Sequence, residues 1–131
     1  MLLLGGAALA GAQTEGSRRL LLDASRALQA GSAARFFSYF DREKVADWPT
    51  LRESVLALTE QRTIASSIEI VSSEEDETAT RVDVDWLLQI TPRDGLGPVE
   101  RRRETLRVKV EPRGRELKIT SIEPIQIFSP Y

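Results

Sequence analysis

The spacing of apolar residues changes near the middle of this 131-residue chain, and this change restricts the fold more than any other feature. Before Thr63, apolar side chains recur every three or four residues, which is typical of helices that bury one face. After Thr63 they alternate with polar side chains, which is typical of strands that bury one face of a sheet. A helical half followed by a strand half predicts one α+β domain, with helices packed on a sheet.

Signals for helix ends divide the first half into three helices. Gly31 follows the first amphipathic run, as glycine often does at a helix end, and Ser32 can cap a second, short helix. The residue before Pro49 is expected to be extended. Thr50 and Glu53 have the spacing of a capping box, so a third helix is expected to begin there. We expect the helices over residues 15–29, 32–41 and 50–62.

Turn-like segments divide the second half into four strands. Connections this short join antiparallel neighbours. Matching apolar residues across the central hairpin places Trp86 opposite Leu106 and Val84 opposite Val108, facing the helices. We expect the strands over residues 64–72, 78–91, 99–111 and 116–128.

The same alternation places Asp83 and Asp85 on the outer face of the sheet, opposite Lys109 and Arg107. Two carboxylates at this spacing could serve metal binding or acid–base chemistry. Because each one has a cationic neighbour across the strand, we interpret them as a solvated ladder of ion pairs. We interpret the acidic run 74–77 as a solvated hairpin tip rather than a calcium site, because it lacks EF-hand spacing.

Charge and composition exclude several classes of function. Eighteen Lys and Arg against twenty Asp and Glu leave a net charge of −2, which favours neither nucleic acid nor an anionic membrane as a partner. The basic run 101–103 alternates between the two faces of a strand, so it forms no single patch. The chain has no Cys and no His, which removes thiol chemistry, the commonest metal ligand and the commonest general base. We expect no cofactor and no metal site.

Residues 1–12 resemble a secretory signal peptide. An uncharged, leucine-rich run is followed by small residues suited to cleavage after Ala10 or, preferably, after Ala12. The run is too short to span a bilayer, which needs about 20 apolar residues. We therefore expect a single mature domain over residues 13–131, secreted or periplasmic. No Lys or Arg precedes Leu2, so we expect the true start codon upstream. The alternative is a cytosolic protein whose apolar extension packs on its own core.

The order of elements, with the aromatic-rich segment 36–41 after the first helix, resembles the nuclear transport factor 2-like superfamily. This superfamily includes ketosteroid isomerase-like and SnoaL-like proteins, and the resemblance covers about Thr14 to Phe128. It implies a cone-shaped, cystatin-like roll: a curved four-stranded antiparallel sheet around the helices, with a cavity at the wide end. It also implies a dimer through the outer sheet face, because members of this superfamily often dimerise through that face. No stretch matches a catalytic motif of the superfamily, so no catalytic residue is transferred.

Candidate site residues follow from placing this chain in such a cone. On the last two strands, alternation brings Glu123 opposite Glu104, and two facing carboxylates would raise the pKa of one, as a general acid or base requires. A β-bulge near residues 120–121 would instead turn Ile122 inward and Glu123 to solvent. Arg102 could orient an anionic substrate or neutralise the carboxylates. The candidate ligand-binding residues, whose aromatic members could equally be core residues, are Phe36, Tyr39, Phe40, Trp48, Trp86, Arg102 and Glu104.

These features favour an exported small domain that binds a small apolar ligand or a protein partner without catalysis. The alternative is an isomerase or dehydratase that transfers protons through a cavity carboxylate, Glu104 or Glu123. A roomy cavity with a shielded carboxylate would favour the enzyme, and a packed cone would favour the partner-binding domain. Leu87, Ile122 and Ile125 interrupt an otherwise polar outer face, so we also expect a homodimer through that face.

Overall fold

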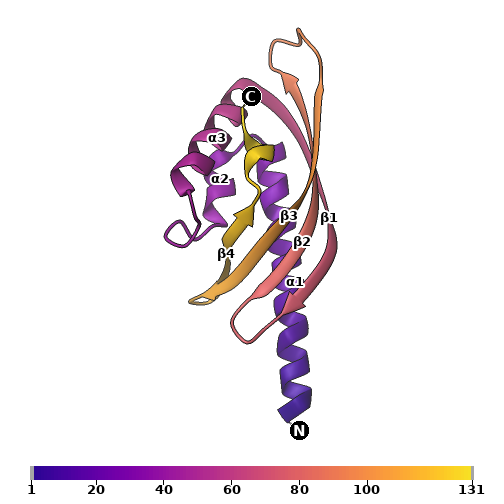
Figure 1. Cartoon of the computed structure of the whole chain (residues 1–131), viewed down its shortest axis with the longest axis vertical. Coiled ribbons are helices and arrows are strands. Elements are labelled where there is room, and N and C mark those ends of the chain that lie inside the picture. Colours follow the sequence, from indigo (N-terminus) through magenta and orange to yellow (C-terminus); the bar gives the residue numbers. More distant parts are fainter. Residues whose placement is uncertain (1, 131) are drawn as a thin grey trace.

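The computed structural model describes residues 2–130, with side chains from Gln13 onward, and has the predicted α+β order of three helices before four strands. The sheet order is β1-β2-β3-β4, and every neighbouring pair is antiparallel. Figure 1 shows the sheet curving around α1, with α2 and α3 at one end. The elements are α1 (Leu2–Gln29), α2 (Ala33–Ser38), α3 (Trp48–Gln61), β1 (Arg62–Glu75), β2 (Thr80–Pro92), β3 (Glu100–Arg113), β4 (Glu116–Glu123) and the short 3-10 helix η1 (Gln126–Phe128).

The turn between α1 and α2 follows the sequence signals. Gly31 has a φ of 72°, a conformation that glycine adopts without steric cost. The Ser32 hydroxyl then accepts a hydrogen bond from the Arg35 N–H at 3.2 Å, which caps α2.

The start of α3 differs from the prediction. The helix begins at Trp48 rather than at Thr50, and Pro49 lies in its first turn instead of terminating an extended bend. Proline is tolerated there because first-turn amides have no partner within the helix. The predicted capping box is therefore wrong: Asp47 is the N-cap residue, and the Thr50 hydroxyl donates to its Oδ1 at 2.7 Å.

The central hairpin has the predicted faces but not the predicted register. Trp86 lies opposite Glu104, and Val84 lies opposite Leu106, two residues away from the expected pairing. Asp83 consequently faces Arg107 rather than Lys109, and Asp85 faces Thr105 rather than Arg107. A shift of two residues keeps every side chain on its face, so a period of two cannot distinguish the two registers.

The last hairpin contains the β-bulge that was considered near residues 120–121. Val108 pairs with Ile122, which is 5% exposed, and Arg107 pairs with Glu123, which is exposed. The predicted strand also ends early, at Glu123 instead of Phe128. Pro124 follows, and proline has no N–H for the ladder, so the chain leaves the sheet and forms η1.

The free edge of β4 is partly covered by the segment that follows α2. Phe40 forms a parallel bridge with Ile119. The Ile119 N–H donates to the Tyr39 carbonyl at 2.8 Å, and the Asp41 N–H donates to the Ile119 carbonyl at 2.9 Å. This short extension fixes the loop after α2 against the sheet.

One core lies between the helices and the concave sheet face. Its largest fully buried side chains come from every layer: Leu21, Leu28, Phe36, Leu51, Leu58, Trp86, Leu88, Ile90, Leu106, Ile119 and Phe128. Gly16 lets α1 approach β4, because a Cβ there would lie 2.8 Å from Leu117 Cδ1. In the part of the chain that the structure describes, no helix combines the length and apolarity needed to cross a membrane.

Candidate functional site

The interior of the cone is filled with aromatic side chains. Phe36, Trp86 and Phe128 are each 0% exposed. The Phe128 ring centroid lies 5.4 Å from that of Trp86, edge to face, and 5.7 Å from that of Phe36. The indole N–H of Trp86 donates to the Ser66 hydroxyl at 2.9 Å, so the one polar atom of that ring is satisfied. Phe36 and Trp86, predicted as ligand-binding residues, therefore lie in the packed core.

Arg102 holds the segment that fills the cone. Its guanidinium donates to the carbonyl oxygens of Ile127, at 2.9 Å, and of Ser129. Its Nε lies 2.6 Å from a Glu100 carboxylate oxygen, and the side chain is 12% exposed. Arg102 thus faces inward as predicted, but its contacts are with the chain itself. The sequence carried no signal for this role, because it depends on where residues 126–129 turn after Pro124.

The two candidate catalytic carboxylates do not meet. Glu104 lies opposite Trp86 and is exposed, while Glu123 lies opposite Arg107 and is exposed. The predicted pairing of Glu104 with Glu123 is therefore wrong: Val110 lies opposite Ile119, and the bulge in β4 then places Glu123 opposite Arg107.

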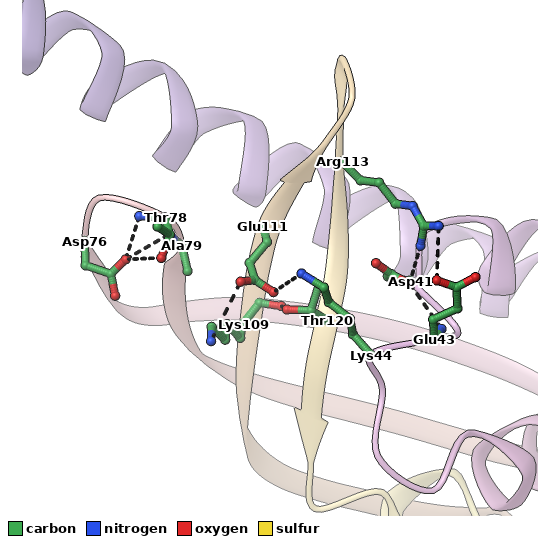
Figure 2. Close-up of polar contacts among 10 residues, drawn as sticks. All are labelled: Asp41, Glu43, Lys44, Asp76, Thr78, Ala79, Lys109, Glu111, Arg113 and Thr120. Carbon is green, nitrogen blue, oxygen red and sulfur yellow. Dashed lines mark hydrogen bonds and ion pairs between the residues drawn. The ribbon is translucent and has the colours of Figure 1, made fainter.

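A buried carboxylate does occur elsewhere, at Asp41, whose side chain is 3% exposed. Arg113, at the end of β3 where the β3–β4 turn begins, donates to Asp41 Oδ1 and lies 3.4 Å from a carboxylate oxygen of Glu43. The Glu43 N–H also donates to Asp41, at 3.1 Å. Figure 2 shows this cluster fastening the loop after α2 to the β3–β4 hairpin. The sequence analysis placed Asp41 at the end of the second predicted helix, but α2 ends at Ser38 and Asp41 lies in the loop that follows, where no local signal marks its burial.

Glu111 forms a second contact between the same loop and hairpin. Its carboxylate lies 3.6 Å from the Lys44 ammonium and 3.9 Å from that of Lys109 (Figure 2). A hydrogen bond from the Thr120 hydroxyl, together with these two cations, lowers the pKa of Glu111 below its usual 4.5. The carboxylate is therefore held in its ionised form.

The outer sheet face carries ion pairs, as predicted, although the partners differ. Asp85 accepts three hydrogen bonds from the Arg103 guanidinium, at 2.6, 3.0 and 3.2 Å, and these bonds lower the pKa of the Asp85 carboxyl. Asp83 accepts a hydrogen bond from the Ser72 hydroxyl at 3.1 Å. A hollow of about 670 Å³ crosses this face, lined by residues of both signs: Ser72, Ser73, Glu74, Arg81, Val82, Asp83, Arg107, Val108, Lys109, Ser121 and Glu123.

The acidic run forms the tip of the β1–β2 hairpin, as predicted. Asp76 Oδ1 accepts hydrogen bonds from the N–H groups of Thr78 and Ala79 at 2.9 and 2.8 Å (Figure 2). These bonds lower the pKa of the Asp76 carboxyl, with Arg81 adding to the effect. The Asp76 carboxylate therefore stabilises the hairpin turn by accepting hydrogen bonds from its backbone.

A smaller hollow of about 460 Å³ lies on the surface where α2, α3 and β4 meet, and we call it the basic–aromatic hollow. Two predicted ligand-binding residues, Phe40 and Trp48, do come together here, with ring centroids 5.7 Å apart. Tyr39 lines a separate hollow of about 450 Å³, beside Leu117. The basic–aromatic hollow is lined by Ala34, Phe37, Ser38, Phe40, Arg42, Trp48, Arg52 and Lys118. Arg42 and Arg52 were missed because isolated arginines resemble ordinary surface charge.

Comparisons with known proteins identify the fold. The sequence matches no protein-family model, and no curated protein has a significantly similar sequence. Among solved structures, a conserved protein from Planctomyces limnophilus has a TM-score of 0.75 at 12% identity, covering 86% of this chain and 94% of that one. An NTF2-like protein with a cystatin-like fold from Novosphingobium aromaticivorans has a TM-score of 0.69 at 10% identity, covering 91% and 84%. A ketosteroid isomerase-like protein from Erwinia carotovora atroseptica has a TM-score of 0.65 at 9% identity, covering 80% and 88%. The chain thus has the nuclear transport factor 2-like fold that its sequence pattern predicted.

Proposed function

We propose that this protein is an exported, non-catalytic binding domain that meets its ligand or partner at the surface rather than inside the cone. The observation that carries this proposal is the filled interior, where Phe128 packs between Phe36 and Trp86. A ligand that bound in the place of the Phe128 ring would have to displace the segment that Arg102 holds. Binding at the surface requires no such displacement, so we place the binding site there.

The distribution of carboxylates supports binding over proton transfer. Among the described residues, Asp41 is the one acidic residue in the buried set, and it is engaged by Arg113 at the sheet edge. Glu104 and Glu123 are both exposed. Because both side chains are exposed, neither has the shielded site that the enzyme alternative requires.

The proposal of export rests on the apolar residues 2–12 and on their place in the fold. Figure 1 shows the first turns of α1 running beyond the end of the sheet. The part of α1 from Gly16 onward packs against the domain, as the close approach to Leu117 indicates. Cleavage after Ala12 would therefore leave this packed part of the helix intact. Expression with the native upstream region and sequencing of the mature N-terminus tests this; an intact Met1 in the cytoplasmic fraction would contradict it.

Binding inside and outside the cone can be separated with the two tryptophans. Trp86 is buried in the cone, whereas Trp48 lies half-buried at the surface, so each indole N–H signal in a ¹⁵N–¹H spectrum reports on one region. We expect 2-naphthol, an uncharged apolar probe, to leave the Trp86 signal of the wild-type protein unchanged. A Phe128→Ala variant that remains folded should bind the probe and shift that signal. A saturable shift of Trp86 in the wild-type protein would overturn the proposal.

A further inference from the structure

We propose that the basic–aromatic hollow binds a small aromatic carboxylate, with the ring against Phe37 and Trp48 and the carboxylate between Arg42 and Arg52. This inference rests on the proposed function, because it specifies the ligand class that the surface would take. It is carried by three properties of the hollow: the sign of its charges, the freedom of its arginines and the arrangement of its rings.

The charged residues that line the hollow are all cationic. Arg42, Arg52 and Lys118 contribute from the loop after α2, from α3 and from β4, and no acidic residue lines it. The two other hollows described above, on the outer sheet face and beside Tyr39, each have at least one Asp or Glu in their lining. The local excess of positive charge is notable because the whole chain has a net charge of −2. An anionic ligand would meet no carboxylate in the lining.

The two arginines are available to a ligand. Both are exposed, and in the described part of the chain neither lies within ion-pair distance of a carboxylate. Lys118 is different: its ammonium donates to the Ser38 carbonyl at 2.6 Å and lies 3.1 Å from Glu116. Lys118 therefore fastens β4 to the end of α2. The planar guanidinium groups of Arg42 and Arg52 suit the two oxygens of a ligand carboxylate.

The aromatic side chains supply a rigid wall for a ring. Phe37 and Trp48 are half-buried and pack edge to face at 5.4 Å, so each retains some exposed surface. Behind them, Phe40 is 5% exposed and packs on Phe36 at 4.9 Å, which ties the wall to the core. A volume of about 460 Å³ falls within the range of small-molecule sites.

The test follows the Trp48 and Trp86 indole N–H signals during titration with 2-naphthoate, a ring that carries a carboxylate. A Trp48→Phe variant assigns the two signals. We expect a saturable shift of Trp48 with Trp86 unchanged. Acetate, which has the charge without the ring, and 2-naphthol, which has the ring without the carboxylate, should each bind at least about tenfold more weakly, because each forms half of the contacts.

The arginine variants decide whether the hollow itself is responsible. The double variant Arg42→Gln/Arg52→Gln should weaken naphthoate binding at least about tenfold, corresponding to about 1.4 kcal/mol. The double variant Arg42→Lys/Arg52→Lys, which keeps the positive charges, should bind naphthoate more tightly than the glutamine variant but less tightly than the wild type. Arg101→Gln, an exposed arginine on β3, is the matched control and should bind as the wild type does. Binding that survives the glutamine variants, or no Trp48 shift at millimolar naphthoate, would overturn this inference alone. A shift confined to Trp86 would overturn the proposed function as well.

Discussion

The Arg102 guanidinium donates a hydrogen bond to the carbonyl oxygen of Ile127, 2.9 Å away, and another to the carbonyl of Ser129. These carbonyls lie on either side of Phe128, so one side chain of β3 holds both ends of the segment that fills the cone. These hydrogen bonds join β3 to the segment around η1, and the bonded residues are 25 and 27 positions apart in the chain.

Replacing Arg102 with Met should lower the free energy of unfolding by about 1–3 kcal/mol, because the Ile127 carbonyl loses a charge-assisted donor. Urea denaturation measures this loss. Arg101→Met on the same strand, where the side chain is exposed, should cost less than about 0.5 kcal/mol. Equal losses in the two variants would show that the contacts of Arg102 add nothing to stability.

Phe128→Ala should be more severe, at about 3–5 kcal/mol, because it leaves a cavity against Trp86 and Phe36. The free energy of unfolding and the fluorescence maximum of Trp86 are the measurements, and a shift to longer wavelength is expected if water enters. Ile125→Ala, at a half-buried position just before η1, is the control and should cost less. A Phe128→Ala protein of wild-type stability would mean that the segment does not pack in solution.

Arg113→Ala should destabilise the protein by about 1–3 kcal/mol, because it leaves the buried Asp41 carboxylate without its charged donor. Arg115→Ala, an exposed arginine in the same hairpin turn, is expected to change stability by less than about 0.5 kcal/mol. A double-mutant cycle with Asp41→Asn isolates the coupling. Strict additivity of the two substitutions would argue that the ion pair is not formed.

Glu111 should give stability a measurable pH dependence. Its pKa is lower in the folded protein than its usual 4.5, so its contribution is present above pH 4.5 and is lost as the pH falls through the folded pKa. The difference in unfolding free energy between wild type and Glu111→Gln should therefore be full at neutral pH and shrink below about pH 4.5. Thr120→Val removes the largest cause of the lowered pKa and should reduce the same difference. A difference that stays constant from pH 7 to pH 3 would contradict this account.

The homodimer through the outer sheet face stays a prediction. The exposed apolar patch on that face is smaller than expected. Ile122 faces the core, whereas Leu87 is 40% exposed and Val71, at the bulge of β1, is 61% exposed. Sedimentation velocity at micromolar concentration should show a dimer that Leu87→Glu dissociates. Leu96→Glu, at the exposed tip of the β2–β3 connection, should leave the dimer intact. A monomer across this concentration range would count against the outer face as an interface.

The period of the apolar pattern was sufficient to predict the α+β class and the faces of β2 and β3, whereas the bulge in β4 reverses the predicted faces of Ile122 and Glu123. Trp86 faces the helices, as expected, because alternation alone determines the face. The pairing of Trp86 with Leu106 was wrong because a shift of two residues keeps the same alternation. Phe128 was assigned to a strand because residues 125, 127 and 128 continue an apolar run, although Pro124 was a signal for an earlier end.

The candidate site was less predictable because its parts come from distant segments. Phe40 and Trp48 are predicted to line a cavity inside the cone, and the structure places them together in a hollow where α2, α3 and β4 meet. Arg42 and Arg52 join them only because Phe40 pairs with β4 and α3 begins at Trp48. No local pattern in the sequence carries that information.

The position of Phe128 in the chain has a consequence for how the domain is assembled. During synthesis or export from the N-terminus, all four strands emerge before Phe128 does. The sheet is built from neighbouring hairpins, so it can pair while the chain is still emerging. Trp86 is therefore synthesised well before Phe128, the ring that packs against it edge to face. Until Phe128 has been added, the apolar surface around Trp86 is uncovered. We expect the nascent domain to be most prone to chaperone binding and misassociation at this stage.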